Sequence, residues 1–574
     1  MQVLHFDNLI VGAGPAGVQL GYFFKKDNVS YCMLEANDTA GSFFAKFPRC
    51  NRLISINKKF NLFTEDEFNF RHDWNSLINE EEPLGFQKYS DKLYPPARKL
   101  AEYINDFAHK HELNIHFKTK ATKIERWNIT GFKVETESGQ TYTCDRIFLA
   151  TGAVLPNIPK EIEGIEHALG YEEYQADPAL YENKRIAILG AGNSAFEVAN
   201  WLQDKAAYIH VLTERPVRHA WDTHFVGDLR AVNASFLDMY QLKSLHATLG
   251  FRPVKLEPND DGTLRMTIEE DLPHWRRPGT TTTRINYDYV IRATGWNYVD
   301  SSIFDENVMP QMDKEAKYPL LDERWETTVP NMYYIGAAMA SRDRKAASGF
   351  VHGFRHNIQV LYNMIRESDY ETPLPTMEFP LDTEQDLVNL SNFLIQRIST
   401  NAGLYQLNGF LCDAMVLHHG KMVIYPELPV EYAKKRFASE KNLIISTLEY
   451  GFHKYDQSIP SNHFIHPADQ DDTRCSAFLH PIYRFYSESE FKHDMELGES
   501  LIVRYDIYDY EENIDHVHSA MLNNFINSIA HVTTKKWDET KYVDGIFEPW
   551  DEETIAMKVK ETHGQEGATC KFMV

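Results

Sequence analysis

Cysteine and basic residues are scarce in this chain of 574 residues. Its six cysteines are widely spaced and form no C-x-x-C pair, which excludes a zinc knuckle and the redox-active dithiol that a disulphide reductase needs. Only 59 basic residues face 83 acidic ones, a net charge of −24, so the composition does not favour binding to nucleic acid or to an anionic membrane surface. No apolar run approaches the roughly 18 residues that cross a bilayer.

Other absences narrow the class further. The first strand is expected by about residue 6, which leaves no room for a signal peptide, so we expect a cytoplasmic protein without membrane contact. At about 150 residues per domain, the length predicts three or four domains. No metal site is predicted, because the C-terminal histidines fit no metal-binding spacing; these are His453, His463, His466 and His480.

The strongest motif opens the chain. Apolar residues 9–11 lead into Gly12-Ala13-Gly14-Pro15-Ala16-Gly17, a G-x-G-x-x-G pattern. In a strand–turn–helix unit the first glycine permits the tight turn, the second lets a diphosphate approach and the third lets the helix pack on the strand. The next strand, expected at 31–34, ends in Glu35, where an acceptor for a ribose hydroxyl should lie. The motif predicts dinucleotide binding.

The pattern returns 178 residues later, counted from Gly12 to Gly190. The apolar strand 185–189 precedes Gly190-Ala191-Gly192-Asn193-Ser194-Ala195, and a helix over 196–202 is followed by a strand over 208–212. Two such units in one chain are suited to hold two dinucleotides face to face. The second unit ends in Thr213 and Arg215 rather than in a carboxylate, and these groups suit a 2′-phosphate, although Glu214 lies between them. We therefore predict FAD on the first unit and NADPH on the second.

Each of the two units also contains a strand that ends in the small residues Ala-Thr-Gly. Ala-Thr-Gly follows the strand 146–149 and again the strand 289–292, where only small residues let the backbone pass beside a cofactor. Residues 39–75 combine basic and aromatic side chains, either to wrap an anion and a ring or as a loop-rich surface. The residues predicted to bind FAD are Gly12, Gly14, Gly17, Glu35, Ser42, Phe43, Arg52, Thr151, Gly152 and Gly336. Those predicted to bind NADPH are Gly190, Gly192, Asn193, Ser194, Ala195, Thr213 and Arg215.

Together these motifs resemble the flavin-containing monooxygenase superfamily. The superfamily's F-x-G-x-x-x-H-x-x-x-(W/Y) motif is only partly met at 162–171, where His167 lies one position early. The resemblance implies an α/β fold with two Rossmann-like domains of flavin monooxygenase type, followed by a mixed, mainly helical C-terminal extension. The expected parts are 1–155 for FAD, 156–284 for NADPH, 285–370 for FAD again and 371–574 for the extension.

Longer strings are similar to an FAD-dependent oxidoreductase family that functions in endoplasmic-reticulum protein degradation. They lie at 41–44, 53–58, 71–77, 223–231 and 240–245, with shorter matches at 403–406 and 479–481. A cytoplasmic relative of that family also resembles the single-component flavin-dependent brominases of marine bacteria. That resemblance implies decarboxylating bromination of 4-hydroxybenzoate, with a small aromatic substrate, O2 and bromide as partners.

The expected chemistry runs across the two units. NADPH would pass a hydride to flavin N5, and the reduced flavin would react with O2 to give a C4a-hydroperoxide, whose terminal oxygen bromide would take. The candidate catalytic residues are Asn57 beside the FAD loop, Lys255 to carry the oxidant, and His224 to deprotonate the phenol. Glu197 is a candidate neighbour of Lys255, and Arg230 a candidate for a substrate carboxylate. Each can equally be a packed or solvated structural residue.

Two other functions stay open at this stage. One is N- or S-hydroxylation of a small amine or sulfide. The other is a non-oxygenase reductase or interaction partner in protein quality control, against which the absence of C-x-x-C argues.

Overall fold

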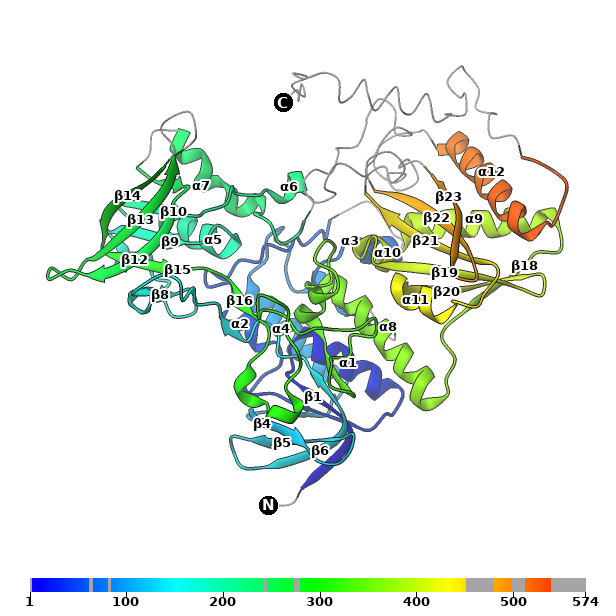
Figure 1. Ribbon diagram of the computed structural model, residues 1–574, viewed down its shortest axis with the longest axis horizontal. Coiled ribbons are helices and arrows are strands. Elements are labelled where there is room, and N and C mark those ends of the chain that lie inside the picture. The colour runs from blue at the N-terminus through cyan, green and yellow to red at the C-terminus, as the bar shows by residue number, and fades with distance from the viewer. Residues whose placement is uncertain are drawn as a thin grey trace. The chain divides into compact units, whose positions relative to one another are not determined.

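The chain divides into two compact units, Met1–Leu374 and Pro375–Val574, in a computed structural model (Figure 1). The structure describes residues 3–60, 66–80, 84–223, 225–241, 245–272, 279–450, 479–497 and 511–537. None of the helices in these ranges is both long and apolar enough to cross a membrane.

The first sheet of the N-terminal unit is built around β1 (Leu4–Val11), whose last four residues are apolar or amide side chains buried in the core. The strand order is β3-β2-β1-β6-β5-β4, and β17 pairs with β6. Strands β1, β2, β3, β6 and β17 run parallel, whereas β4 and β5 add an antiparallel edge. The other strands are β2 (Tyr31–Leu34), β3 (Ile115–His116), β4 (Ala121–Arg126), β5 (Phe132–Thr136), β6 (Thr141–Leu149) and β17 (Met332–Tyr334).

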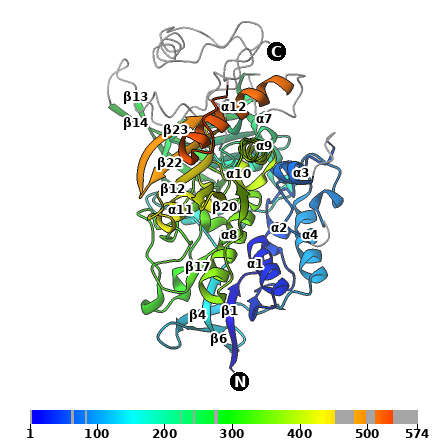
Figure 2. The same ribbon diagram turned by 90° about the vertical axis from the view of Figure 1, so that its right-hand side faces the viewer.

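Two helices from distant parts of the sequence pack together in this domain. Helix α1 (Pro15–Lys26) lies beside α8 (Val351–Tyr370) in both views (Figures 1 and 2). The rings of Phe23 and Tyr362 stack with centroids 5.4 Å apart, and the Tyr362 hydroxyl donates to Asp27. The helix predicted over 97–109 is α4 (Ala97–Lys110), and its apolar face is buried. Shorter helices are α2 (Ser42–Lys46) and α3 (Asp66–His72).

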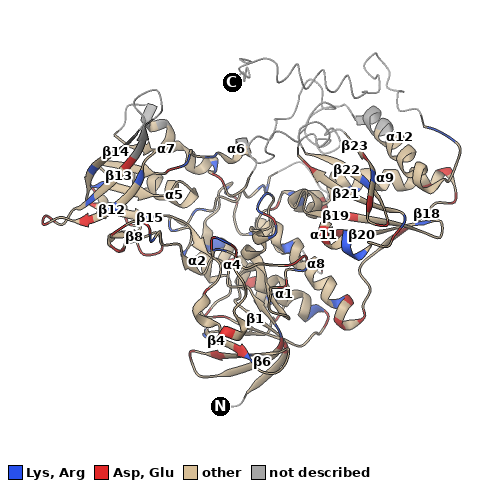
Figure 3. Ribbon diagram, viewed as in Figure 1, with Lys and Arg blue, Asp and Glu red and all other residues tan. Residues whose placement is uncertain are grey.

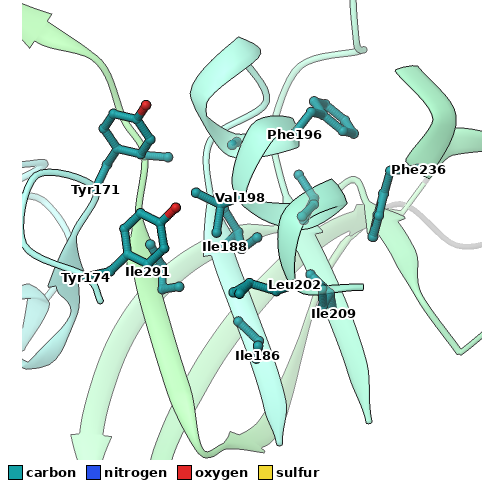
Figure 4. Packing of buried hydrophobic residues seen from close by; sticks show 14 of the residues in the cluster. Tyr171, Tyr174, Ile186, Ile188, Phe196, Val198, Leu202, Ile209, Phe236 and Ile291 are labelled. Carbon is teal, nitrogen blue, oxygen red and sulfur yellow. The ribbon is translucent and has the colours of Figure 1, made fainter. Parts of the chain in front are cut away.

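The second domain has a five-stranded parallel sheet in the order β11-β10-β9-β15-β8. Helix α5 (Asn193–Leu202) covers it, and Figure 4 shows Val198 and Leu202 beside the apolar side chains of β9, whereas Phe196 faces Phe236. A three-stranded antiparallel sheet, β12-β13-β14, completes the domain. The strands are β8 (Leu169–Gly170), β9 (Arg185–Leu189), β10 (Tyr208–Leu212), β11 (Ala247–Leu249), β12 (Arg252–Pro258), β13 (Leu264–Leu272), β14 (Gly279–Tyr287) and β15 (Tyr289–Arg292).

The position of β15 corrects one predicted boundary. Because β15 pairs with β9 in parallel, the second domain extends to at least Arg292, not to 284. The chain returns to the first domain only afterwards, where β16 (Trp296–Asn297) pairs with β7 (Leu155–Pro156). The Ala-Thr-Gly sequence after β15 therefore belongs to the second domain. Helices α6 (Ala220–Thr223) and α7 (Ala231–Gln241) also belong to it.

The C-terminal unit is built on a six-stranded antiparallel sheet in the order β18-β20-β19-β21-β22-β23. Most residues of β19 and β21 are buried. The two long helices of the unit are also linked, since the buried Ser391 hydroxyl of α9 donates to Asn523 of α12 at 2.8 Å. The prediction of a mixed extension that contains helices is confirmed, and the six-stranded sheet at its centre was not predicted. The elements are β18 (Met377–Pro380), α9 (Glu384–Thr400), α10 (Ala402–Gln406), β19 (Leu411–His418), β20 (Lys421–Pro429), α11 (Val430–Arg436), β21 (Leu443–Glu449), β22 (His480–Ser487), β23 (Glu490–Glu496) and α12 (Glu511–Ala530).

Candidate active site

The first glycine loop joins β1 to α1 by close backbone contacts. Gly12 has φ +107°, and a Cβ there would lie 2.6 Å from the carbonyl oxygen of Ala150. A Cβ on Gly17 would lie 2.0 Å from the carbonyl oxygen of Gly12. A Cβ on Gly14, in contrast, would meet no protein atom within 4 Å. Two glycines thus serve the packing of the fold, whereas Gly14 leaves space at the N-terminus of α1 for a ligand.

Glu35 fixes the shape of this loop. Its buried carboxylate accepts the backbone N–H of Ala13 through Oε2 and the backbone N–H of Asn37 through Oε1, both at 2.9 Å. The Ser42 hydroxyl also donates to Oε1, at 3.3 Å. The structure therefore brings together Glu35 and Ser42, and it gives the carboxylate a role in holding the loop that the motif did not predict.

The remaining predicted FAD residues lie in two places. Gly336 has φ +80° and packs against the first turn of α1, since a Cβ there would lie 2.7 Å from Cβ of Ala16. Gly152 has φ +61° and faces open space, and the backbone of Thr151 adjoins Gly12. Phe43 and Arg52 lie elsewhere: Phe43 packs on Phe47 and Trp296, and Arg52 donates to the carbonyl oxygen of Val232 in the second domain at 3.1 Å.

The second glycine loop repeats the first. Gly190 has φ +112°, and a Cβ there would lie 2.4 Å from the carbonyl oxygen of Ala293. A Cβ on Gly192 would meet nothing within 4 Å. Each Ala-Thr-Gly strand thus lies against the glycine turn of its own domain. A small pocket beside the second loop is lined by Tyr171, Glu172, Ser194, Arg292, Ala293, Thr294, Gly295 and Trp296.

Asn193 has a structural role that its motif did not indicate. Its Nδ2 donates to the carbonyl oxygens of Gly227 and Asp228 at 3.2 and 2.8 Å, and its Oδ1 accepts the backbone N–H of Arg230 at 3.0 Å. Ala195, the next predicted residue but one, is fully buried in the helix–sheet core. Asn193 therefore fastens the segment 227–230 to the second glycine loop.

The end of β10 presents an exposed guanidinium. The Thr213 hydroxyl donates to the carbonyl oxygen of Arg215 at 2.9 Å and accepts the backbone N–H of the same residue at 3.2 Å, which closes a tight turn. The Arg215 side chain is exposed and has no ion pair within the described ranges. This leaves one cation at the position expected for a ribose phosphate.

Glu197 of α5 connects the two domains. Its Oε1 accepts the backbone N–H of Cys50 at 2.8 Å, and its Oε2 accepts the hydroxyl of Tyr171 at 2.7 Å. Arg49 adds a bond from Nη2 to the carbonyl oxygen of Tyr174 at 2.6 Å. Burial raises the pKa of the Glu197 carboxyl, although these hydrogen bonds oppose the effect. Figure 4 shows Tyr171 and Tyr174 at the edge of the second-domain core.

The structure describes two of the three predicted catalytic residues, Asn57 and Lys255, and gives each of them structural partners. His224 lies outside the described residues. Lys255 lies on β12, which carries charges of both signs (Figure 3), and its Nζ pairs with Glu163 at 2.9 Å and Glu257 at 3.0 Å. The expected pairing of Lys255 with Glu197 is wrong, because Glu197 points to Cys50 and Tyr171 instead. The Asn57 amide donates to the carbonyl oxygen of Ser90 at 2.7 Å and is buried, so it holds a loop.

The structure also contains a cationic and aromatic cluster, which we call the Trp74 cluster and which the sequence did not predict as a group. It consists of Lys58, Trp74, Arg230 and His352. Nζ of Lys58 and Cζ of Arg230 lie 5.0 and 4.9 Å from the Trp74 ring centroid, and the His352 ring stacks on Trp74 at 5.2 Å. The four residues come from three chain segments of both domains. Single residues of these types gave no sequence signal beyond the enrichment at 39–75.

His352 stays neutral in this setting. Burial, together with the nearby charges of Arg355, Arg230 and Lys58, lowers the pKa of His352 to about 3, although a backbone hydrogen bond with Trp74 opposes the shift. Arg355 is itself fully buried, and it donates to the carbonyl oxygens of Ser76 and Phe70 at 2.6 and 2.8 Å. Positive charge is thus concentrated here in a chain that is acidic overall.

One group of potential metal ligands occurs within the described ranges. Ligand atoms of His5, Asp7 and Asp145 lie within 4.8 Å of one another. Nδ1 of His5 lies 3.1 Å from the Thr143 hydroxyl. The group has no further feature that points to an ion.

Two glycine loops, each with its own Ala-Thr-Gly strand, define a flavoprotein with two dinucleotide sites. The chain belongs to the pyridine nucleotide-disulphide oxidoreductase family, whose model matches residues 9–336. It is 31% identical over 531 residues to FAD-dependent oxidoreductase domain-containing protein 2 of Mus musculus, covering 86% of this chain and 77% of that protein. It is 28% identical over 304 residues to flavin-containing monooxygenase 3 of Oryctolagus cuniculus, covering 43% and 57%.

These similarities confirm two of the predicted relationships, to the flavin-containing monooxygenase superfamily and to the FAD-dependent oxidoreductase family. The chain is an FAD-binding oxidoreductase of flavin monooxygenase type. The four cysteines in the described ranges, Cys32, Cys50, Cys144 and Cys412, are all free. The first site fits FAD, because open space at Gly14 adjoins the N-terminus of α1 and small residues at 151–152 adjoin the same loop.

We expect Gly14→Val to give a folded protein without flavin. Gly14 has φ −73°, which valine can adopt, and its side chain would meet no protein atom, so only the ligand is displaced. The measurements are the flavin absorbance and the thermal unfolding midpoint of the apoprotein. Gly250→Val is the matched control, since Gly250 also faces open space but lies outside the site. A Gly14→Val protein that retains its flavin would contradict the assignment.

Glu197→Gln should change the pH dependence of stability. At pH below the ordinary carboxyl value of 4.5, Glu197 is protonated in both states and resembles glutamine. As the pH rises, the unfolded chain ionises first, because burial raises the pKa of Glu197 in the folded state, and the wild type loses stability. The thermal midpoint of Glu197→Gln relative to wild type should therefore increase between pH 4.5 and 8. A decrease would show that the fold favours the ionised carboxylate.

Lys255→Ala should leave flavin content and NADPH oxidation unchanged. The ammonium is half-exposed and pairs with two carboxylates on the surface of the β12–β14 sheet. The measurement is the steady-state rate of NADPH oxidation, and Lys421→Ala in the C-terminal unit is the control. A rate loss specific to Lys255→Ala would restore the catalytic role predicted from sequence.

Proposed function

We propose that this chain is a single-component, NADPH-dependent flavin oxygenase whose principal reaction is bromination of a phenol such as 4-hydroxybenzoate, with loss of the carboxyl group. The observation that carries the oxygenase part is the combination of two joined dinucleotide sites with free, separated cysteines and no C-x-x-C pair. A reductase of dithiols needs two neighbouring thiols. FAD, when bound, would accept a hydride from NADPH and activate O2 for transfer to bromide or substrate.

The residues of this chain would contribute positioning and exclusion of water. Glu197, Tyr171 and the backbone of Cys50 hold the domains against each other, which keeps the two cofactor sites in a fixed relation. The buried ring of His352 stacks on the partly buried rings of Trp74 and Phe350, and the three rings supply an aromatic wall that limits access of water. These features support an enclosed reaction site between the first and second domains.

The preference for NADPH rests on Arg215. Its guanidinium is exposed after β10 and has no acidic partner within the described ranges, while Thr213 fixes the turn that presents it. A guanidinium binds a phosphate by two parallel hydrogen bonds, which a ribose hydroxyl cannot match. Glu214 beside it would oppose the same phosphate, so the balance has to be measured.

Arg215→Gln should raise the KM for NADPH by about ten- to a hundredfold, corresponding to loss of roughly 1.5–3 kcal/mol for a charged hydrogen bond. The KM for NADH should stay unchanged. Initial rates with both nucleotides test this, with Arg252→Gln as the control because Arg252 of β12 is an exposed arginine paired with Glu269 of β13. Equal effects on both nucleotides would remove the phosphate assignment.

Product analysis tests the reaction. The FAD-loaded enzyme with NADPH, O2 and 4-hydroxybenzoate should give bromophenols by mass spectrometry when bromide is present, and no such product when bromide is omitted. Hydrogen peroxide as the sole product across phenols would remove the brominase proposal. Bromide-independent oxygenation of an amine or sulfide would instead favour N- or S-hydroxylation, the second candidate, in keeping with the similarity to a flavin-containing monooxygenase.

A further inference from the structure

An arginine without a carboxylate partner lies at the junction of the two nucleotide-binding domains. The guanidinium of Arg230 is half-buried, and it forms no hydrogen bond or ion pair with any residue in the described parts of the chain. Burial lowers the pKa of the Arg230 guanidinium, which reflects the cost of keeping this cation partly out of water. A partly desolvated cation without a counter-ion is costly, and a bound anion would remove that cost.

The position of Arg230 is fixed on both sides. Its backbone N–H donates to Asn193 of the second glycine loop at 3.0 Å. Its side chain lies over Trp74 of the first domain, 4.9 Å from the ring centroid. An arginine held at its backbone and stacked on an aromatic face is pre-organised, so it loses little side-chain entropy when a planar anion binds.

Lys58 strengthens the field at the same ring. Its Nζ lies 5.0 Å from the same Trp74 centroid, so two cations share one indole. Both lower the pKa of His352, which shows that their charges reach the buried imidazole. The place where the two positive charges come together favours a negatively charged ligand.

His352 provides an independent observation. It is 3% exposed, and its Nε2 has no hydrogen-bond partner. The backbone hydrogen bond with Trp74 raises the pKa, so in it the imidazole donates, and Nδ1 is the nitrogen left to do so. Nε2 of the neutral ring is then an acceptor. A buried acceptor left unpaired costs about 1–3 kcal/mol, which a hydroxyl of a bound molecule would offset.

We propose that the Trp74 cluster binds an aromatic hydroxy acid, with Arg230 pairing with its carboxylate and Nε2 of His352 accepting its hydroxyl proton in a hydrogen bond. Lys58 adds charge at the same ring. This deepens the proposed function by naming the substrate class that the site recognises, and it rests on that function for the fate of the bound molecule. Binding itself needs no turnover and can be measured separately.

The test uses the FAD-loaded full-length chain and isothermal titration calorimetry without NADPH. Three probes separate the contacts: 4-hydroxybenzoate has both groups, 4-hydroxybenzyl alcohol lacks the carboxylate, and benzoate lacks the hydroxyl. We expect 4-hydroxybenzoate to bind most tightly. Arg230→Gln should weaken the binding of 4-hydroxybenzoate by about ten- to a hundredfold and leave the affinity for 4-hydroxybenzyl alcohol unchanged. The affinity of Arg230→Lys for the acid should be intermediate, because lysine keeps the charge but cannot form two parallel hydrogen bonds.

His352→Phe should weaken 4-hydroxybenzoate toward the affinity of benzoate while leaving benzoate itself unchanged, since phenylalanine keeps the ring stack but has no acceptor. Arg252→Gln is the matched charge control on the second domain. Flavin content is measured for every variant. If Arg230→Gln binds the acid as wild type does, or if it instead raises the KM for NADPH in oxidation without substrate, the proposal is overturned. If the His352→Phe variant loses its flavin, Nε2 of His352 contacts the cofactor instead. The proposed hydrogen bond from the ligand hydroxyl to Nε2 would then be overturned.

These outcomes are independent of the reaction. Arg230-dependent binding of the acid without any brominated product would retain this proposal and remove the proposed bromination. Bromination of phenols with no preference for a carboxylate would retain the function and remove the binding assignment.

Discussion

The carboxylate of Glu197 is the interaction on which the arrangement of the two nucleotide-binding domains depends. It lies on the helix that begins at the second glycine loop, and it accepts a backbone N–H from the aromatic-rich segment of the first domain. Its other oxygen is taken by Tyr171 of the second domain. Because both oxygens have donors, the group tolerates burial that would otherwise disfavour its charge. One side chain thereby fixes α5, the segment around Cys50 and the strand-connecting region at Tyr171.

A second constraint is repeated in both domains. Each glycine turn has φ above +100° and meets the carbonyl oxygen of an alanine in the neighbouring Ala-Thr-Gly strand. No side chain fits at Gly12 or Gly190, so β1 contacts β6, and β9 contacts β15, as closely as backbones allow. The second glycine of each motif faces open space instead. In each motif the first glycine is therefore needed for close packing of the backbone, and the second leaves space for the ligand. The distance from a Cβ placed at each glycine to the nearest protein atom separates the two roles.

Local patterns in the sequence predicted the parts of the fold that local chemistry determines. The glycine loops, the strands feeding them and helix α4 follow from apolar periodicity and from the steric needs of glycine. The boundary at 284 was wrong because an Ala-Thr-Gly strand reads the same in either domain, and only its pairing with β9 assigns it. The sequence could not show whether Lys255 lies near Glu197, because the pairing of strands joins residues that are distant in the sequence. The Trp74 cluster could not be predicted as a group for the same reason. Its members are Lys58, Trp74, Arg230 and His352, which lie in three segments that are far apart in the sequence and come together only in the fold.

The charge distribution explains why such a cluster points to function rather than to stability. With a net charge of −24 the chain has more carboxylates than cations, and many described lysines and arginines are paired with one, as Arg185, Lys255 and Arg344 are. Arg355 is buried without such a partner, but backbone carbonyl oxygens satisfy its guanidinium. Arg230 has neither kind of partner among the described residues, and it contacts the same indole as His352, whose Nε2 also has no partner. Two unsatisfied groups of opposite hydrogen-bonding character, donor and acceptor, share one indole ring. A single molecule that carries an anion and a hydroxyl satisfies both, whereas a protein contact for either alone would leave the other unpaired.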